Sequence, residues 1–112
     1  MRTRTRPCDK VRRDRFGIPI LSFGHAGDGN FHVNLMIQDT QGDRAKAEEA
    51  VKEIFAEALR LGGTMSGEHG IGLSKAPYLG MKLSAEVMAT MKRVKQLFDP
   101  NNILNPGKIF PD

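Results

Sequence analysis

The sequence has 112 residues, 39% of them hydrophobic and 27% charged, which predicts one globular domain rather than a disordered or fibrous chain. Its one cysteine, Cys8, excludes an internal disulfide, and no apolar run reaches the roughly 18 residues that cross a bilayer. We therefore expect a cytoplasmic protein with no transmembrane segment, in contact with a membrane at most through its partners.

The net charge of +4 is concentrated at the N-terminus. Residues 1–15 carry seven Lys and Arg against two Asp, whereas residues 16–112 carry ten basic and eleven acidic side chains. This charge comes with no interleaved aromatic residues and no recognition motif, so we expect no nucleic-acid binding. We interpret residues 1–15 as a basic, solvated or frayed segment and residues 16–112 as the domain.

Two short apolar runs flank the glycine-rich stretch AGDGN. Residues 16–23, FGIPILSF, predict one strand, and residues 31–37, FHVNLMI, alternate as a half-buried strand does. The two runs predict an antiparallel hairpin. Pairing them symmetrically about residues 26–31 would place His25 opposite His32 and Phe23 opposite Asn34.

Two helices are predicted after the hairpin. Asp43 is a suitable N-cap for a helix that ends near Leu61, where Gly62 follows. Ser84 is a suitable N-cap for a helix that ends near Phe98. The positions with helical spacing that we expect to face inward are Ala47, Ala50, Val51, Ile54, Ala58 and Leu61 in the first helix, and Val87, Met91, Val94 and Phe98 in the second.

The remaining segments complete an α+β fold. Residues 64–66 are a weak strand candidate. Pro100 ends the second helix, and the prolines and asparagines of the tail, residues 99–110, predict a loop. We therefore expect an antiparallel β-hairpin packed by two main helices, with a C-terminal loop tail.

Two glycine-rich segments carry residues that suit a metal site. Directly opposed histidines, His25 and His32, would have Cβ atoms about 5 Å apart, and Asn34 would share their face. The segment SGEHGIG adds a carboxylate, Glu68, and a third imidazole, His69. Two imidazoles and one carboxylate suit Zn²⁺ or Mn²⁺, and His69 could then act as a general base. The same residues also fit a polar hairpin face and an ordinary surface loop, so both interpretations stay open.

Three motifs carry a family resemblance: FGHAGDGNFHVN, GGTMSGEHGIGLSKAPYL and LFDPNNILNPGKIF, in this order. Together they resemble the C-terminal cap or substrate domain of FAD-linked 2-hydroxyacid dehydrogenases, the group that includes the glycolate oxidase flavin subunit, D-lactate dehydrogenase and D-2-hydroxyglutarate dehydrogenase, among the vanillyl-alcohol-oxidase-like flavoproteins. The resemblance implies a partial ferredoxin-like arrangement. It also implies a site in which His25, His32 and Glu68 hold a divalent metal, Asn34 contacts substrate, His69 is the base and Asn105 contacts the cofactor. Lys75 and Lys108 are candidates for contact with an anionic substrate or the flavin.

The resemblance further implies a C-terminal fragment or split subunit of an enzyme that oxidises a 2-hydroxy acid to a 2-oxo acid. FAD would be held mainly by a domain absent from this chain, so we expect the chain to need a flavin-binding domain or subunit and to be inactive alone. An exposed sheet edge or apolar face would favour a homo-oligomer. The alternatives are a non-catalytic, self-associating α+β module that retains the motif and, less favoured, a stand-alone metal hydrolase that uses Glu68 or His69.

Overall fold

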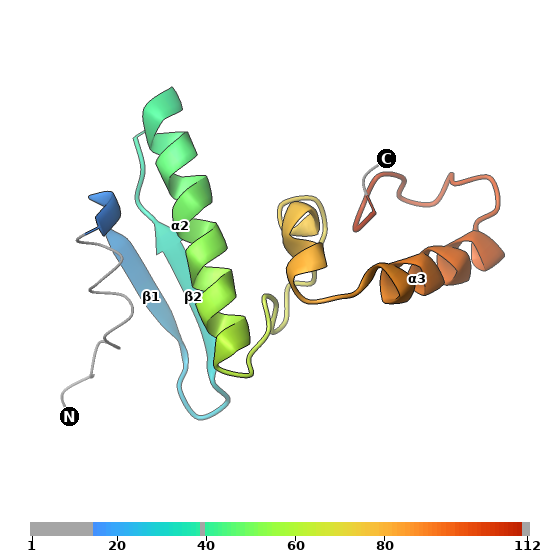
Figure 1. The fold of residues 1–112 in the computed structure, drawn as a ribbon, viewed down its shortest axis with the longest axis horizontal. Coiled ribbons are helices and arrows are strands. Elements are labelled where there is room, and N and C mark those ends of the chain that lie inside the picture. The colour runs from blue at the N-terminus through green and yellow to red at the C-terminus, as the bar shows by residue number, and fades with distance from the viewer. Residues whose placement is uncertain (1–14, 39, 111–112) are drawn as a thin grey trace. The chain divides into compact units, whose positions relative to one another are not determined.

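The computed structural model describes residues 15–38 and 40–110, and the chain divides into two compact units, residues 1–57 and 58–112. A two-stranded antiparallel sheet accompanied by helices confirms the predicted α+β class (Figure 1). The basic segment predicted over residues 1–15 lies outside the described residues except for Arg15, whose Nη1 is 2.7 Å from Glu53 Oε1. None of the helices in the described ranges is both long enough and apolar enough to cross a membrane.

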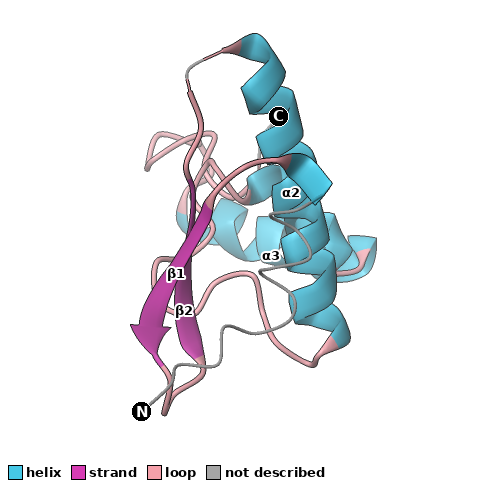
Figure 2. Cartoon of the chain, turned by 90° about the vertical axis from the view of Figure 1, so that its left-hand side faces the viewer, coloured by secondary structure: helices cyan, strands magenta, loops and turns pink. Residues whose placement is uncertain are grey.

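The first unit contains the predicted hairpin. Strand β1 spans Ile20–His25 and strand β2 spans Asn30–Leu35 (Figure 2). Strand β1 begins later than predicted, directly after Pro19, which has no N–H to donate to a ladder. The loop between the strands is closed by the N–H of Asp28, which donates to the carbonyl of His25 (3.2 Å). This turn leaves only residues 26–29 outside the ladder.

Gly24 lets the two strands approach closely. A Cβ atom at this position would lie 2.2 Å from the carbonyl oxygen of Asn30 and 2.9 Å from the Cα of Phe31. Both neighbours are backbone atoms, so they cannot move aside without shifting β2. The position therefore requires glycine for steric reasons.

Helix α2 spans Gln41–Arg60, and its N-cap is not the one predicted. The side-chain oxygen of Thr40 accepts a hydrogen bond from the N–H of Asp43 (3.2 Å), so Thr40 caps the helix. Asp43 instead lies in the first turn, where its charge complements the positive end of the helix dipole. Ala50 is fully buried, as predicted, whereas Leu61 is 61% exposed and not inward.

In the first unit, α2 runs alongside the hairpin (Figure 1). At its C-terminus, in the second unit, the predicted stop at Gly62 is confirmed. Gly62 has a φ of +77°, and the N–H groups of Gly62 and Gly63 donate to the carbonyls of Leu59 and Ala58 at 3.0 and 2.8 Å. These two bonds form a Schellman motif, which satisfies carbonyl groups that the helix leaves unpaired.

The strand predicted at residues 64–66 is wrong, because these residues form an irregular loop. The short 3-10 helix η1 follows at Ala76–Met81, where Pro77 occupies its first turn. Among the residues of the second unit that the structure describes, the buried apolar ones are Met65, Ala76 and Leu79.

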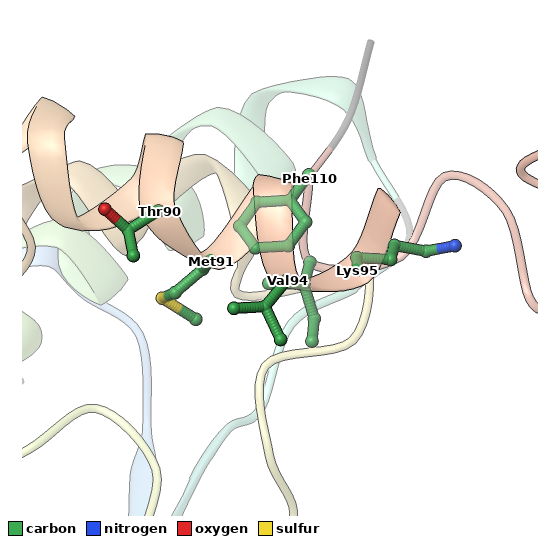
Figure 3. Close-up of a pocket in the computed structure, with 6 residues that line it drawn as sticks. Thr90, Met91, Val94, Lys95 and Phe110 are labelled. Atoms are coloured by element: carbon green, nitrogen blue, oxygen red, sulfur yellow. The ribbon is translucent and has the colours of Figure 1, made fainter. Parts of the chain in front are cut away.

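Helix α3 spans Ala85–Phe98 with the predicted cap, since Ser84 Oγ accepts from the N–H of Val87 (3.4 Å). A hydrogen bond from Ser84 also lowers the pKa of Glu86. The predicted inward face is wrong: Val87, Met91, Val94 and Phe98 are 45%, 37%, 54% and 77% exposed. Within the described residues of this unit, Thr90, Met91, Val94 and Lys95 of α3 form a groove with Ile109 and Phe110 of the tail (Figure 3). Most of the apolar stripe on α3 stays in contact with solvent.

The tail is an irregular segment, as predicted, and Asp99 organises it. The Asp99 side chain is almost fully buried, accepts from the backbone N–H groups of Ile103 (2.9 Å) and Leu104 (3.0 Å), and pairs with Lys95 Nζ. The Lys95 hydrogen bond is the largest of the effects that lower the pKa of Asp99, and the two N–H groups add to it while burial opposes it. The charged side chain of Asp99 therefore anchors the start of the tail and is shielded from water.

The close approach at Gly24 makes a prediction about the hairpin. We expect Gly24→Ala to lower the free energy of unfolding by on the order of 2 kcal/mol, because the new Cβ displaces the backbone of β2. Gly27→Ala is the matched control, since a Cβ there has no atom within 4 Å. Urea denaturation of both variants measures the difference, and equal midpoints would contradict the geometry.

The lowered pKa of Asp99 predicts how acid affects stability. The carboxylate stabilises the fold fully above its unfolded pKa of about 3.9, and this contribution is lost as the pH falls through the lowered folded value. We expect Asp99→Asn to make the decline of stability below about pH 4 shallower than in the parent. It will not abolish the decline, because the pKa of Glu86 is also lowered. Denaturation curves of the parent and of Asp99→Asn at a series of pH values down to about pH 3 measure the difference, and parallel declines would contradict the role of Asp99.

Candidate functional site

The predicted site residues of the first unit lie together on one face of the hairpin. The ladder pairs Leu21 with Asn34, Phe23 with His32 and His25 with Asn30. Side chains alternate between the faces of a strand, so all six of these residues share one face. His25, His32 and Asn34 are therefore together on a single surface, as predicted.

The predicted pairing within this face is wrong by two residues. His25 lies opposite Asn30 rather than His32, and Phe23 lies opposite His32 rather than Asn34. The cause is the turn: the bond from the N–H of Asp28 to the carbonyl of His25 closes a loop of residues 26–29, shorter than the expected 26–31. His25 and His32 are consequently diagonal neighbours, at a typical spacing of about 7–8 Å, which long side chains still bridge.

Phe23 orients the imidazole of His32. The two rings stack with centroids 5.1 Å apart and an interplanar angle of 27°. His32 is half-buried, whereas His25 and Asn34 are exposed. Phe23 thus limits the orientations of one predicted ligand, a role that the alternation pattern did not predict because it marks Phe23 only as apolar.

In the second unit, Glu68 and His69 lie side by side in the glycine-rich loop. Glu68 Oε1 is 3.5 Å from His69 Nε2, and the side chains are 49% and 70% exposed. The loop turns tightly here: Ser66 Oγ donates to the carbonyl of Gly70 (2.9 Å), and Gly70 has a φ of +75°. A carboxylate has two oxygens, so Glu68 can face the imidazole with one oxygen and offer the other to a cation.

The other predicted contacts lie elsewhere in the second unit. Asn105 is an exposed tail residue with a φ of +49°, a conformation that asparagine tolerates better than most residues. Lys108 Nζ donates to the carbonyl of Pro106 (3.0 Å), and Lys75 is the N-cap residue of η1. Sequence reasoning missed the anchoring role of Asp99, because an Asp-Pro pair after a helix is typical of a simple turn.

Comparisons with known proteins identify the family. The family described as "FAD linked oxidases, C-terminal domain" matches residues 9–109. Glycolate oxidase subunit GlcD of Bacillus subtilis is 52% identical over 97 residues, which are 86% of this chain and 21% of that protein. D-lactate dehydrogenase of Anaerostipes hadrus is 48% identical over 80% of this chain and 19% of its own length. D-2-hydroxyglutarate dehydrogenase of Xanthomonas citri pv. viticola is 46% identical over 81% of this chain and 20% of its own. The chain thus spans about a fifth of the length of these relatives.

The register of the hairpin predicts which side chains are energetically coupled. In a double-mutant cycle, we expect Phe23→Leu and His32→Leu to couple by about 0.5–1 kcal/mol, because the two rings are stacked cross-strand partners. The diagonal pair His25→Leu and His32→Leu should couple more weakly. Chemical denaturation of the single and double variants gives both energies. A coupling energy for His25 and His32 larger than that for Phe23 and His32 would contradict the observed register and favour the pairing expected from the sequence.

Proposed function

The chain belongs to the C-terminal domain family of FAD linked oxidases, and from this premise we propose that it forms the substrate-side portion of an enzyme that oxidises a 2-hydroxy acid to a 2-oxo acid. The observation that carries the proposal is the match, over most of this chain, to a glycolate oxidase subunit, a D-lactate dehydrogenase and a D-2-hydroxyglutarate dehydrogenase. The substrates in these names are all 2-hydroxy acids. That shared chemistry defines the proposed substrate class.

The donor set of this chain fits a divalent metal. In the proposal His25, His32 and Glu68 supply the ligand atoms, and two imidazoles with one carboxylate are the set that catalytic zinc accepts while leaving positions for substrate. The stacking of Phe23 on His32 supports this role, because a ligand whose orientation is already restricted loses less entropy on binding. A bound Zn²⁺ or Mn²⁺ would supply Lewis acidity toward the substrate hydroxyl.

His69 and Asn34 carry the remaining chemistry on this chain. His69 takes the proton of the substrate hydroxyl at an imidazole nitrogen, and its neighbour Glu68, 3.5 Å away, offers negative charge to the imidazolium that results. Asn34, exposed on the same hairpin face as both metal-ligating histidines, hydrogen-bonds the substrate. Lys75 and Lys108 contribute positive charge toward the substrate carboxylate or the flavin.

The flavin partner completes the electron balance. Oxidation of a 2-hydroxy acid removes one proton from the hydroxyl and one hydride from Cα, and FAD supplies the hydride acceptor when it is bound. We propose that a flavin-binding domain or subunit holds FAD and that Asn105 in the tail adds one contact to it. The chain alone is then not expected to turn over substrate.

A non-catalytic, self-associating module is the second candidate. The observation that favours it is the exposed apolar surface of the second unit, where Leu97, Phe98 and Ile103 are 77%, 77% and 72% exposed. Surfaces of this kind mark sites of association. This candidate predicts a concentration-dependent oligomer whose melting temperature is the same with and without a chelator.

The ligand assignment predicts the effect of three substitutions. We expect the chain to bind about one Zn²⁺ or Mn²⁺, and His32→Ala and Glu68→Gln each to weaken binding by more than about tenfold, because each removes a ligand. His69→Ala is the matched control: it removes an imidazole from the same loop as Glu68 but should retain the metal. Isothermal titration calorimetry and elemental analysis of the purified variants measure these effects.

The same variants test the reaction. When the chain replaces the corresponding C-terminal segment of the Anaerostipes hadrus D-lactate dehydrogenase, we expect dye reduction with D-lactate, and His69→Ala to lower kcat by about 10²–10⁴-fold. Metal-free parent protein, or unimpaired turnover in the His69→Ala hybrid, would overturn the corresponding half of the proposal.

A further inference from the structure

The C-terminal tail of the second unit returns to the loop that carries Glu68 and His69. Residues 100–110, here named the strap, leave the end of α3 at Asp99 and reach Gly72, where the N–H of Ile109 donates to the Gly72 carbonyl (2.8 Å). Gly72 lies three residues after His69 in the sequence. This backbone bond ties the end of the strap to the loop of the proposed base.

Asp99 fixes the start of the strap. Its two carboxylate oxygens accept from Ile103 and Leu104, and its own carbonyl accepts from the N–H of Asn102 (3.1 Å). Lys95, one turn earlier on α3, donates both to the Asp99 carboxylate and to Asn102 Oδ1 (3.1 Å). Only 5% of Asp99 is exposed, so the carboxylate is satisfied almost entirely by these groups and not by water.

The far end of the strap is held in an unfavourable backbone conformation. Ile109 has a φ of +66°, which a β-branched residue rarely adopts, so surrounding contacts must hold it there. Its side chain and that of Phe110 line the groove on α3 with Met91 and Val94 (Figure 3). Lys92 Nζ lies 5.8 Å from the centre of the Phe110 ring, a cation–π contact that adds to the apolar packing.

The loop that carries Glu68 and His69 is also closed by hydrogen bonds of its own. Ser66 closes its first half through Gly70, and the N–H of Lys75 donates to Ile71 at 3.3 Å. Glu68 and His69 lie within the turn that the Ser66 bond closes, and their side chains are 49% and 70% exposed. Besides the chain that runs through η1, the strap connects this loop to α3.

We propose that Asp99 is a positioning residue that acts through the strap on the loop of Glu68 and His69. The inference rests on the proposed function for the roles of these two residues. Asp99 holds the start of the strap against α3, and Ile109 and Phe110 hold the end of the strap in the groove. The bond from Ile109 to Gly72 then restricts the conformations of the loop. Loss of the anchor frees the loop and leaves α3 intact.

Two variants test this in the full chain. Asp99→Asn keeps the size of the side chain but removes its charge. Ile109→Pro removes the N–H that bonds Gly72 and cannot adopt the φ of +66°, so it detaches the end of the strap without altering Asp99. Ser84→Ala, which weakens α3 at its opposite end, is the control for general destabilisation. Amide hydrogen exchange of metal-free protein and titration with Zn²⁺ are the two measurements.

In both variants we expect amides of residues 68–73 to exchange about tenfold faster while amides in the middle of α3 keep the parent rate. The Kd for Zn²⁺ should rise by about tenfold, whereas Ser84→Ala should leave the Kd unchanged. Unchanged exchange in the loop, or faster exchange with the parent's zinc affinity, would overturn the inference. A parent that binds no zinc would instead overturn the proposed metal site, and the exchange result would still decide whether Asp99 positions the loop.

Discussion

The alternation of side chains along an antiparallel ladder is the constraint on which the hairpin site depends. A shift of pairing by one residue would move His32 and Asn34 to the opposite face, whereas a shift by two changes only their partners. The observed register differs from the expected one by two residues, so His25, His32 and Asn34 keep their common face. The common face is therefore kept under this shift of two residues, but the contacts within it change: Phe23, rather than His25, lies opposite His32 and stacks on it.

In the second unit, the carboxylate of Asp99 lies at the C-terminus of α3, and backbone N–H groups of the strap stabilise its charge. A carboxylate at a helix C-terminus meets the negative end of the helix dipole, which disfavours it. Asp99 occupies this position while almost fully buried, and Lys95 and two backbone N–H groups compensate its charge. If the strap detached, the carboxylate would lose two donors and the N–H groups would lose their acceptor. The charge and the path of residues 100–110 therefore stabilise each other.

The sequence predicts the elements of this fold better than their contacts. Ser84 and Gly62 are confirmed as helix signals because each acts on backbone groups within a few residues. The N-cap predicted at Asp43 is wrong because Thr40, three residues earlier, is also a residue type that caps helices and accepts the N–H of Asp43. The spacing of Val87, Met91 and Val94 identifies an apolar stripe on α3, yet periodicity says nothing about what covers a stripe, and this one is largely exposed. The hairpin register failed for a similar reason, since it depends on the turn at Asp28 and not on the alternation of the strands.

Two carboxylates of the second unit occupy opposite environments, and the contrast bears on which of them is suited to chemistry. Asp99 has its lone pairs committed to Lys95, Ile103 and Leu104 and is closed to solvent, so binding a cation would require these bonds to break. Glu68 is half exposed, lies in a loop that glycines turn tightly, and has an imidazole 3.5 Å away. A carboxylate that can exchange water for a ligand at little cost is the one expected to act on substrate or metal. The burial of Asp99 thus indicates a structural role, whereas the exposure of Glu68 supports it as the carboxylate of the loop that binds a ligand.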